Sequence, residues 1–322
     1  MRIGFIGLGN VGGKLAGSLQ RNGFDLLVRD LQRSQAQPFL DNGAGWAESP
    51  AEIAAQVDMI ITCLPSPAAC SAVMEGDGGV LAGLSEGKIW AEMSTTDEAE
   101  VRRLGELVSA KGAEPIDCPV SGGCHRAATG NISIFVGGDR RTFERALPAI
   151  KAMGRRILHT GRLGSASILK VVTNYLATAN LLSLCEAMTT AKQAGMDLTS
   201  TYEAIRISSG NSFVHETESQ VILNGSRDIS FTMDLVVKDL TLFQAVADRA
   251  GVPLEISPLL LQIFEDGEAR YGAREWSPNI VRRLEEACGT KILASGFPAE
   301  MIDDESEQAG QEVEVRGRSR LD

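Results

Sequence analysis

The first half of the chain alternates short runs of Val, Ile and Leu with longer stretches in which apolar residues recur every three or four positions. The short runs are typical of buried strands, and the stretches between them are typical of amphipathic helices. The expected strands lie at residues 2–6, 25–28, 58–64, 88–92, 114–117 and 132–136. Because strands that alternate with helices pair in parallel, the pattern predicts an α/β domain with a doubly wound parallel sheet at residues 1–163.

The second half of the chain has helical periodicity without strand signals. Residues 165–194 contain no Gly or Pro, and apolar residues occur on nearly every helical face. This stretch predicts one long, largely buried helix of about 45 Å at 1.5 Å per residue. Further helical patterns at residues 233–250 and 254–271 predict an all-α domain at residues 164–290.

The end of the chain differs in composition from the rest. Residues 298–322 carry eight Asp or Glu and three Arg and almost no aromatic side chain. Such a segment buries too little apolar surface to offset the entropy lost on ordering. We therefore expect residues 291–322 to form a mobile acidic tail, in which Gly296-Phe297-Pro298 could dock.

Charge and composition narrow the classes of partner. The net charge of −11 disfavours nucleic acid and anionic membrane surfaces, since both attract clusters of Lys and Arg. No apolar run approaches the roughly 20 residues that span a bilayer, and the N-terminus has no secretory signal pattern, so we expect a cytoplasmic protein without a membrane partner. Three single histidines and six cysteines without a C-x-x-C pair predict no metal site.

A G-x-G-x-x-G motif directly follows the first expected strand and precedes a helical stretch. In this context the first glycine permits a tight turn, the second lets a pyrophosphate approach the backbone, and the third allows close packing of helix on strand. The start of the next helix adds free amides and the positive end of its dipole. The motif predicts a dinucleotide-binding, Rossmann-type domain, with a pyrophosphate loop made of Gly7, Leu8, Gly9, Asn10, Val11 and Gly12.

Asp30 lies at the end of the second expected strand, 18 residues beyond Gly12. This is close to the spacing at which an acidic side chain binds the adenosine ribose hydroxyls. Its charge would repel a 2′-phosphate, which favours NAD over NADP. Arg29 and Arg33 leave the alternative open, because either guanidinium could bind that phosphate.

Two further expected strands end in loops at the carboxyl edge of the sheet, where ligands bind in open α/β folds. Leu64 and Pro65 begin a rigid, proline-containing loop, and Ser94 and Thr95 follow the next strand. We predict that these four residues line the cofactor site. The alternative for the hydroxyls is helix capping alone, since Thr95 and Glu98 have the spacing of a capping box.

A Ser-Gly-Gly motif follows the strand expected at residues 114–117. The amides of Gly122 and Gly123, with the Ser121 hydroxyl, could bind a carboxylate, and a plain turn is the alternative. Lys170 and Asn174 stand four residues apart on one face of the expected long helix. A lysine in such apolar surroundings indicates a function, although its ammonium could also reach solvent from a packed stem.

These motifs resemble the β-hydroxyacid dehydrogenase family, which includes 3-hydroxyisobutyrate dehydrogenase and tartronate semialdehyde reductase. The resemblance covers the chain from residue 2 to about residue 288. Four ordered motifs carry it, namely residues 4–12, residues 117–123 with Gly130-Asn131, residues 161–164 leading to Lys170 and Asn174, and Lys238-Asp239.

The resemblance implies an oxidoreductase that transfers a hydride between NAD and a small 3-hydroxy acid or its semialdehyde. It implies that Lys170 is the catalytic acid and base, that Asn174 orients the substrate, and that residues 121–123 bind the substrate carboxylate. It also implies that Lys238 lies beside the cofactor, although an exposed charge pair of Lys238 with Asp239 is the alternative.

The chain departs from the family pattern at Asn10-Val11, at Tyr175 and at Cys124-His125-Arg126. Arg126 could bind a second anionic group, such as a sulfonate or a second carboxylate, or it could face solvent. Two rival functions are an imine reductase, which generally lacks a lysine at the position of Lys170, and a non-catalytic nucleotide-binding scaffold. The apolar helical domain also favours a homodimer or homotetramer.

Overall fold

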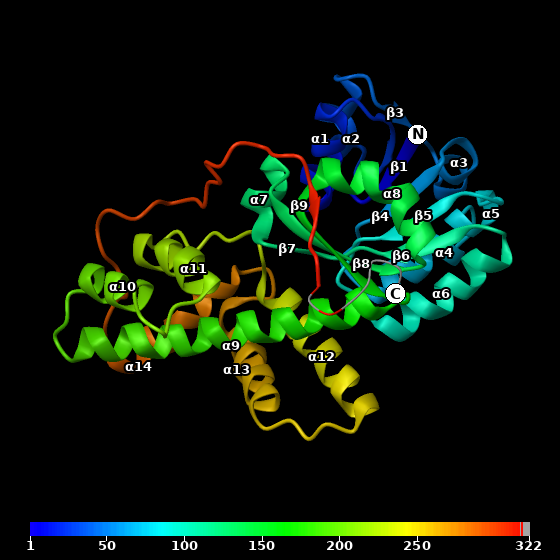
Figure 1. The fold of residues 1–322 in the computed structure, drawn as a ribbon. Coiled ribbons are helices and arrows are strands. Elements are labelled where there is room, and N and C mark those ends of the chain that lie inside the picture. Colours follow the sequence, from blue (N-terminus) through cyan, green and yellow to red (C-terminus); the bar gives the residue numbers. More distant parts are fainter. Residues whose placement is uncertain (316, 318–322) are drawn as a thin grey trace. The chain divides into compact units, whose positions relative to one another are not determined.

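The computed structural model describes residues 1–315 and residue 317, and it divides the chain into two compact units (Figure 1). Unit 1 comprises Met1–Lys170 together with the C-terminal segment from Asp303, and unit 2 comprises Val171–Ile302. The boundary therefore lies seven residues later than the position expected from the sequence, and the chain returns to unit 1 at its end.

Unit 1 is built on one sheet with the strand order β10-β9-β8-β6-β5-β4-β1-β2-β3, and β7 pairs with β8. All pairs are parallel except β6 with β8 and β7 with β8, so the predicted parallel sheet is confirmed. The strands are β1 Arg2–Ile6, β2 Asp25–Arg29, β3 Gly45–Trp46, β4 Met59–Thr62, β5 Ile89–Glu92, β6 Glu114–Asp117, β7 Val120–Ser121, β8 Ile132–Gly138, β9 Gly154–Gly161 and β10 Gln311–Glu312.

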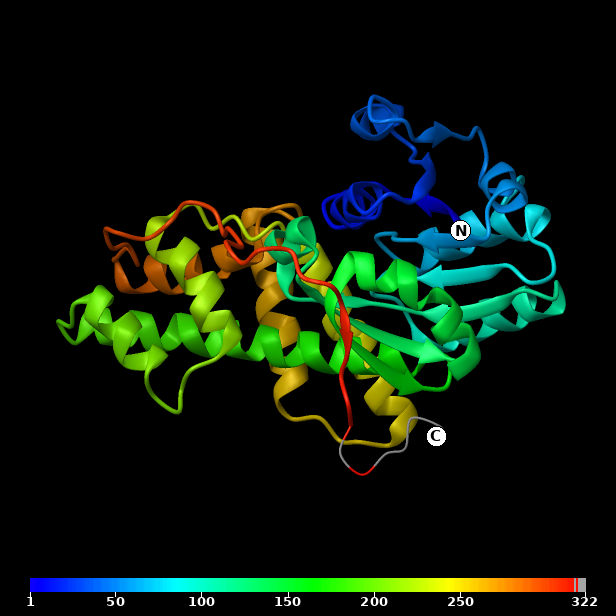
Figure 2. The same cartoon turned by 45° about the horizontal axis from the view of Figure 1, so that its top comes forward.

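Helices cover both faces of this sheet (Figure 2). Successive strand residues point to opposite faces, so Ile61 packs with Leu15 and Phe143 in one cluster, and Ile60 packs with Leu104 in another. This arrangement confirms the doubly wound α/β fold. The helices of unit 1 are α1 Gly12–Arg21, α2 Arg33–Leu40, α3 Pro50–Gln56, α4 Pro67–Glu75, α5 Val80–Gly83, α6 Glu98–Ala110, α7 Gly123–Thr129 and α8 Arg140–Met153.

Helix α6 begins later than the sequence predicts. Its N-cap is Asp97, whose side chain accepts a hydrogen bond from the Ala99 amide at 2.7 Å. Glu98 pairs instead with Arg102 at 3.3 Å. The predicted capping box of Thr95 and Glu98 is therefore wrong, because a carboxylate two residues further along is available as the cap.

Unit 2 is helical throughout its described residues, apart from one isolated bridge between Thr232 and Trp276. The all-α domain predicted from the sequence is confirmed. Its elements are α9 Ser165–Gln193, which starts in unit 1, α10 Leu198–Arg206, α11 Phe213–Asn224, α12 Met233–Ala250, α13 Ile256–Tyr271, the 3-10 helix Ser277–Val281 and α14 Arg282–Cys288.

Helix α9 has the predicted length but not the predicted burial. Leu181, Cys185 and Met188 pack in the core of unit 2, whereas Leu169 and Leu176 are 37% and 53% exposed. The expectation that no segment is apolar enough to span a bilayer is also wrong for α9, since it meets that test by length and a mean hydropathy of 1.3. Core helices of globular proteins meet the same test, so this finding is weak evidence for a membrane.

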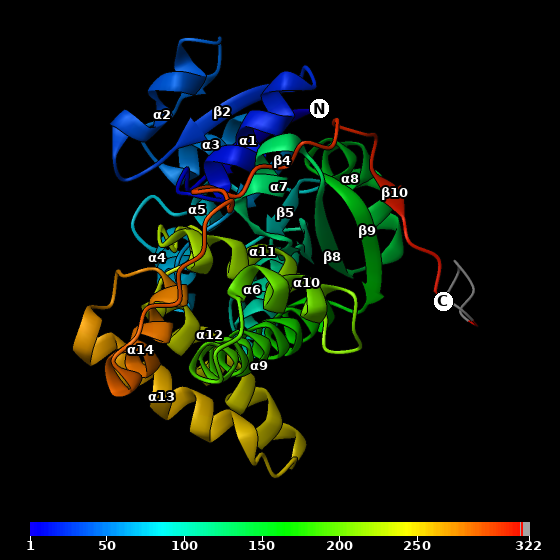
Figure 3. The same ribbon diagram turned by 90° about the vertical axis from the view of Figure 1, so that its left-hand side faces the viewer.

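The segment predicted to form a mobile acidic tail makes defined contacts in the described residues. Residues up to 302 belong to unit 2, where Phe297 meets the Tyr202 ring edge-on at 5.0 Å. From Asp303 onward the chain follows unit 1, and β10 adds a parallel strand to β9 (Figure 3). Backbone pairing and ion pairs thus replace the apolar burial that this segment lacks. Residues 316 and 318–322 of the predicted tail lie outside the described residues.

Asp117, the last residue of β6, fixes the start of α9. Its buried carboxylate accepts hydrogen bonds from the Gly164 amide at 2.8 Å, the Ser167 amide at 2.7 Å and the Ser167 hydroxyl at 2.8 Å. Burial raises the pKa of Asp117, and these hydrogen bonds oppose that rise. The free amides at the start of a helix attract a carboxylate, so Asp117 determines where α9 begins.

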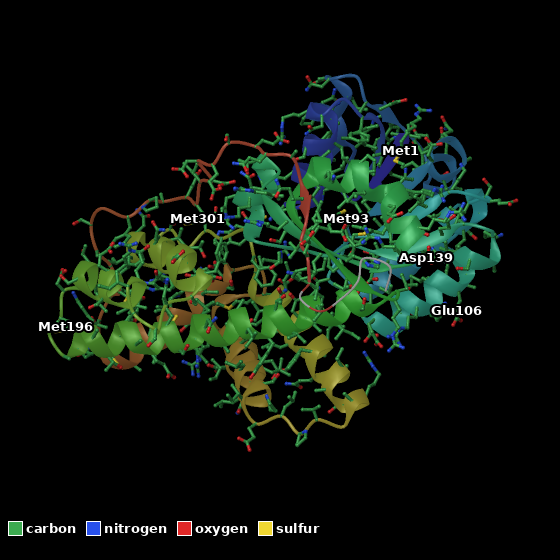
Figure 4. The ribbon with its side chains drawn as sticks, in the orientation of Figure 1. Met1, Met93, Glu106, Asp139, Met196 and Met301 are labelled. Atoms are coloured by element: carbon green, nitrogen blue, oxygen red, sulfur yellow. The ribbon has the colours of Figure 1, made fainter. Side chains whose placement is uncertain are left out.

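The Asp117→Ala substitution should lower the free energy of unfolding by about 1–3 kcal/mol, because it leaves buried donors without an acceptor. Urea denaturation measures this change. The matched control is Asp139→Ala, which removes the exposed N-cap of α8 (Figure 4) and its bond from the Arg141 amide. A loss at Asp117 no larger than the loss at Asp139 would contradict the anchoring role.

Glu218 of α11 is an uncompensated buried carboxyl group in unit 2. Its Oε2 atom is buried and has no hydrogen-bond partner among the described residues. Burial therefore raises the pKa of Glu218 from 4.5 to about 8. Because the folded state holds this proton more tightly than the unfolded state does, the resulting stability is complete below pH 4.5 and disappears as the pH rises through about 8.

The Glu218→Gln variant should lose this pH dependence. Between pH 5 and pH 8, the melting temperature of the unmodified protein should fall relative to that of the variant. Thermal melts at matched pH values measure the difference, and Glu186→Gln, at an exposed position on α9, is the control. Parallel curves for the unmodified protein and the Glu218→Gln variant would show that Glu218 ionises normally.

Candidate functional site

The glycine loop joins β1 to α1 with the geometry that the sequence predicts. Gly7 has φ +97°, and its amide donates to the Arg29 carbonyl at 3.0 Å. A Cβ atom on Gly12 would lie 2.1 Å from the Gly7 carbonyl oxygen, whereas a Cβ atom on Gly9 would meet nothing within 4 Å. The first and third glycines are thus required by the fold, and the space beside Gly9 fits the approach of a dinucleotide pyrophosphate.

Asp30 ties this loop to the end of β2. One carboxylate oxygen accepts from the Leu8 amide at 2.7 Å, and the other accepts from the Gln32 amide at 2.8 Å. A carboxylate oxygen has a second lone pair, so Asp30 can still accept from ribose hydroxyls. Asp30 therefore both holds the glycine loop and remains able to bind the ribose, as predicted.

The two arginines that could have bound a 2′-phosphate have other partners. Arg29 stacks on the Trp46 ring at 5.8 Å and donates to the Ala47 carbonyl at 3.1 Å. Arg33 lies 5.0 Å from the same ring and 3.4 Å from a Glu48 carboxylate oxygen. Each guanidinium would have to leave these contacts in order to bind a phosphate.

A buried carboxyl group joins the ends of β4 and β5. Glu92 accepts from the Thr62 hydroxyl and from the Ser94 amide, both at 2.7 Å. The Ser94 hydroxyl then accepts from the Leu64 amide at 2.7 Å, so two of the predicted cofactor residues are in direct contact. Burial raises the pKa of Glu92. The sequence analysis missed this residue, although an acid inside the apolar strand β5 was a visible signal.

The other two residues predicted from these loops are Pro65 and Thr95. Pro65 is exposed, and Thr95 is half-buried between Ser94 and Thr96. Ser66, which follows Pro65, caps α4 by accepting from the Ala69 amide at 3.2 Å. That Pro65 and Thr95 line the cofactor site stays a prediction, which rests on their positions next to Leu64 and Ser94.

The Ser-Gly-Gly motif links β7 to α7. Gly122 has φ +130° and Gly123 has φ +86°, conformations that side chains other than glycine rarely adopt. A Cβ atom on Gly123 would lie 2.8 Å from the His125 ring. The loop therefore carries no side chain of its own at these two positions, and the His125 ring packs against Gly123.

Arg126 and His125 lie on α7, not in the solvent-facing loop that was one of their two sequence interpretations. Both are half-buried. The Cδ atom of Arg126 would be 3.5 Å from a Cβ atom on Gly122, so its side chain packs against the Ser-Gly-Gly backbone. Burial and the charge of Arg126 lower the pKa of His125. Arg126 thus supplies the fixed positive charge beside this loop.

Lys170 lies in the second turn of α9 and is 9% exposed. Lys170 lies three residues after Ser167, which donates to Asp117. The same Asp117 ends β6, which leads directly to the Ser-Gly-Gly loop. One strand end therefore anchors both the helix that carries Lys170 and the chain that leads to Ser121.

Asn174, one turn further along α9, belongs to a polar cluster in unit 2. Its amide nitrogen donates to Asp239, which is 2% exposed. The ammonium of Lys238 lies 2.8 Å from the other Asp239 oxygen. The charge pair of Lys238 with Asp239 is therefore present, but it is not exposed as that alternative expected, because Asp239 is buried. Sequence reasoning named Asp239 only as part of a motif and missed that it orients Asn174.

Comparison with known proteins identifies both halves of this arrangement. Residues 2–161 match the family described as the NAD binding domain of 6-phosphogluconate dehydrogenase. Residues 164–284 match the family described as NAD-binding of NADP-dependent 3-hydroxyisobutyrate dehydrogenase.

Similar proteins extend the match over most of the chain. A 2-(hydroxymethyl)glutarate dehydrogenase of Eubacterium barkeri is 32% identical over 293 residues, 91% of this chain and 97% of the relative. The mitochondrial 3-hydroxyisobutyrate dehydrogenase of Mus musculus is 31% identical and covers 81% of this chain and 80% of its own length. A structure of Mycobacterium tuberculosis 3-hydroxyisobutyrate dehydrogenase with L-serine is 25% identical, with a TM-score of 0.78 over 88% of this chain and 99% of that one.

The glycine loop, the parallel sheet and these matches agree with each other, and the resemblance drawn from the sequence motifs is confirmed. The chain belongs to the β-hydroxyacid dehydrogenase family of NAD-dependent oxidoreductases that act on CH–OH groups.

Proposed function

We propose that this enzyme oxidises the hydroxymethyl group of a small 3-hydroxy acid to the semialdehyde, and catalyses the reverse reduction, with Lys170 as acid and base. The observation that carries the proposal is the Asp117 anchor. It joins the start of the helix bearing buried Lys170 to the strand that leads to the Ser-Gly-Gly loop. An ammonium group and a carboxylate-binding loop that share one anchor fit a substrate with a hydroxyl near its carboxylate.

The names of the relatives define a common chemical unit. 3-Hydroxyisobutyrate, 2-(hydroxymethyl)glutarate and L-serine all carry a hydroxymethyl group and a carboxylate on one carbon atom. They differ in the third substituent, which is a methyl, a carboxyethyl or an ammonium group. We infer that this enzyme accepts the shared unit and that its specificity lies in how it treats the third substituent.

Bound at the loop of residues 7–12, NAD would supply the acceptor for the hydride that leaves the hydroxyl-bearing carbon. The chain's own groups do the remaining work. Ser121 and the Gly122 and Gly123 amides hold the carboxylate, and Asn174, oriented by Asp239, directs the substrate. Lys170, as the neutral amine, takes the hydroxyl proton during oxidation, and as the ammonium group it returns a proton to the carbonyl oxygen during reduction.

Asp30 favours NAD over NADP in this proposal, because its carboxylate would repel a 2′-phosphate. The stacking of Arg29 and Arg33 on Trp46 supports the same preference. Beside the site, Leu64 and Ser94 would line the nicotinamide end, held by Glu92.

A second candidate substrate is a hydroxy acid with another anionic group. The stem of Arg126 packs on the Gly122 backbone, and we infer that its guanidinium would pair with a second carboxylate or a sulfonate of such a substrate. The 2-(hydroxymethyl)glutarate named for the Eubacterium barkeri relative is such a dicarboxylate.

We also propose that the enzyme works in the cytoplasm as a homodimer or homotetramer. Leu169 and Leu176 are exposed and lie seven residues apart, on one face of α9. A second copy of the chain would cover these apolar side chains.

Lys170→Ala should lower kcat about 10²–10⁴-fold, since it removes the acid and base. Binding of NADH, measured by fluorescence titration, should not change. Turnover should be assayed with 3-hydroxyisobutyrate, 2-(hydroxymethyl)glutarate and L-serine, each with NAD and with NADP. Lys192→Ala, at the exposed end of α9, is the control. Undiminished turnover in Lys170→Ala would reject the proposed role.

Arg126→Gln should separate the two substrate candidates. If Arg126 binds a second carboxylate, KM for 2-(hydroxymethyl)glutarate should rise about tenfold or more, because a hydrogen bond between charged groups is lost. KM for 3-hydroxyisobutyrate, which has one carboxylate, should stay within about twofold under the same account. Equal changes for both acids would show that Arg126 does not recognise the third substituent.

A further inference from the structure

The C-terminal segment, residues 303–313, lies outside both stretches that match the family descriptions, the second of which ends at residue 284. It nevertheless packs on unit 1 through specific polar contacts. Its first residue, Asp303, contacts the turn that joins α7 to β8, and α7 begins at the Ser-Gly-Gly loop.

At this turn one oxygen of Asp303 accepts two hydrogen bonds. The side-chain amide of Asn131, which is 5% exposed, donates to it at 2.8 Å, and the Thr129 hydroxyl donates to it as well. The Asn131 amide also donates to the Glu305 backbone carbonyl at 3.0 Å. Partial burial opposes ionisation of Asp303, but these hydrogen bonds outweigh it and lower the pKa of the carboxyl group.

The two residues that bind Asp303 also close the end of α7. The Arg126 carbonyl accepts from the Asn131 backbone amide at 2.9 Å, and the Thr129 hydroxyl oxygen lies 3.2 Å from the same carbonyl oxygen. Between them, Gly130 has φ +75°, the left-handed conformation that ends many helices. Asp303 therefore braces the last turn of a seven-residue helix whose first residue is Gly123.

The segment has further anchors. Glu307 accepts from Asn22 at 2.8 Å and also lies against Gly130, which ends α7. Glu312 pairs with Arg140, which is not part of α7. The Val313 amide donates to the Ile157 carbonyl at 2.7 Å, in line with the β10 pairing. These contacts hold the segment on unit 1 independently of Asp303.

We propose that Asp303 is a positioning residue for the substrate: through Thr129 and Asn131 it holds α7 and thereby the geometry of the Ser121–Gly122–Gly123 carboxylate loop. This inference rests on the proposed function of that loop. A short helix with one braced end transmits displacement to its other end, because the intervening backbone is rigid. The C-terminal segment is thus part of the substrate-binding apparatus although it lies about 180 residues beyond the loop in the sequence.

The experiment compares Asp303→Ala with Glu312→Ala in the full chain. Asp303→Ala should raise KM for the hydroxy acid about fivefold and speed amide hydrogen exchange at residues 123–131, with KM for NAD unchanged. Glu312→Ala, which loosens the same segment at Arg140, should leave KM for the hydroxy acid and exchange at α7 unchanged. Asp303→Asn should largely restore KM, because a single amide oxygen can accept from both Thr129 and Asn131.

The proposal is overturned if Asp303→Ala leaves either KM for the hydroxy acid or exchange at α7 unchanged. It is also overturned if KM for NAD rises equally, or if Glu312→Ala has the same effects, since both results indicate general loosening. An equal rise in KM for the hydroxy acid in Asp303→Asn and Asp303→Ala would exclude positioning by these hydrogen bonds. If the unmodified enzyme oxidises no acid of the panel, the proposed function fails, whereas the exchange comparison still tests whether Asp303 holds α7.

Discussion

The placement of the candidate site depends on one interaction, the buried Asp117 carboxylate that accepts from the first turn of α9. Strand β6 and helix α9 are separated by almost 50 residues of sequence, so only a long-range contact can fix their register. Leaving the Gly164 and Ser167 donors unsatisfied would cost about 1–3 kcal/mol. The direction in which Lys170 leaves the helix follows from that register, since each residue turns the helix by a fixed angle.

Two further buried acids act in the same manner. Glu92 ties the ends of β4 and β5 together through Thr62 and Ser94, and Asp239 holds the amide of Asn174. Each carboxyl group is taken out of water, which is costly unless hydrogen bonds are gained in return. Buried carboxyl groups thus hold neighbouring polar side chains in one conformation. Catalysis by a positioned side chain requires such fixed geometry.

Local patterns predicted the parallel sheet, the glycine loop and the helical second unit. These features depend on periodicity and turn residues that lie close together in the sequence. They did not predict β10, since Gln311 and Glu312 pair with β9 by backbone hydrogen bonds that any residue could form. They also did not predict the partners of Asp117 or Asp303, which depend on contacts far apart in the sequence. The acidic composition of the end of the chain indicated a solvated tail, yet those acids meet arginines and amides of unit 1.

The central claim is that a lysine set by the Asp117 anchor acts on a hydroxy acid whose carboxylate lies on the Ser-Gly-Gly loop. A crystal structure of the enzyme with NADH and 3-hydroxyisobutyrate tests it most directly. The account predicts the substrate hydroxyl oxygen within about 3 Å of the Lys170 ammonium nitrogen, with the substrate carboxylate on the backbone of residues 121–123. A carboxylate bound elsewhere, or a hydroxyl beyond hydrogen-bonding reach of Lys170, would contradict it.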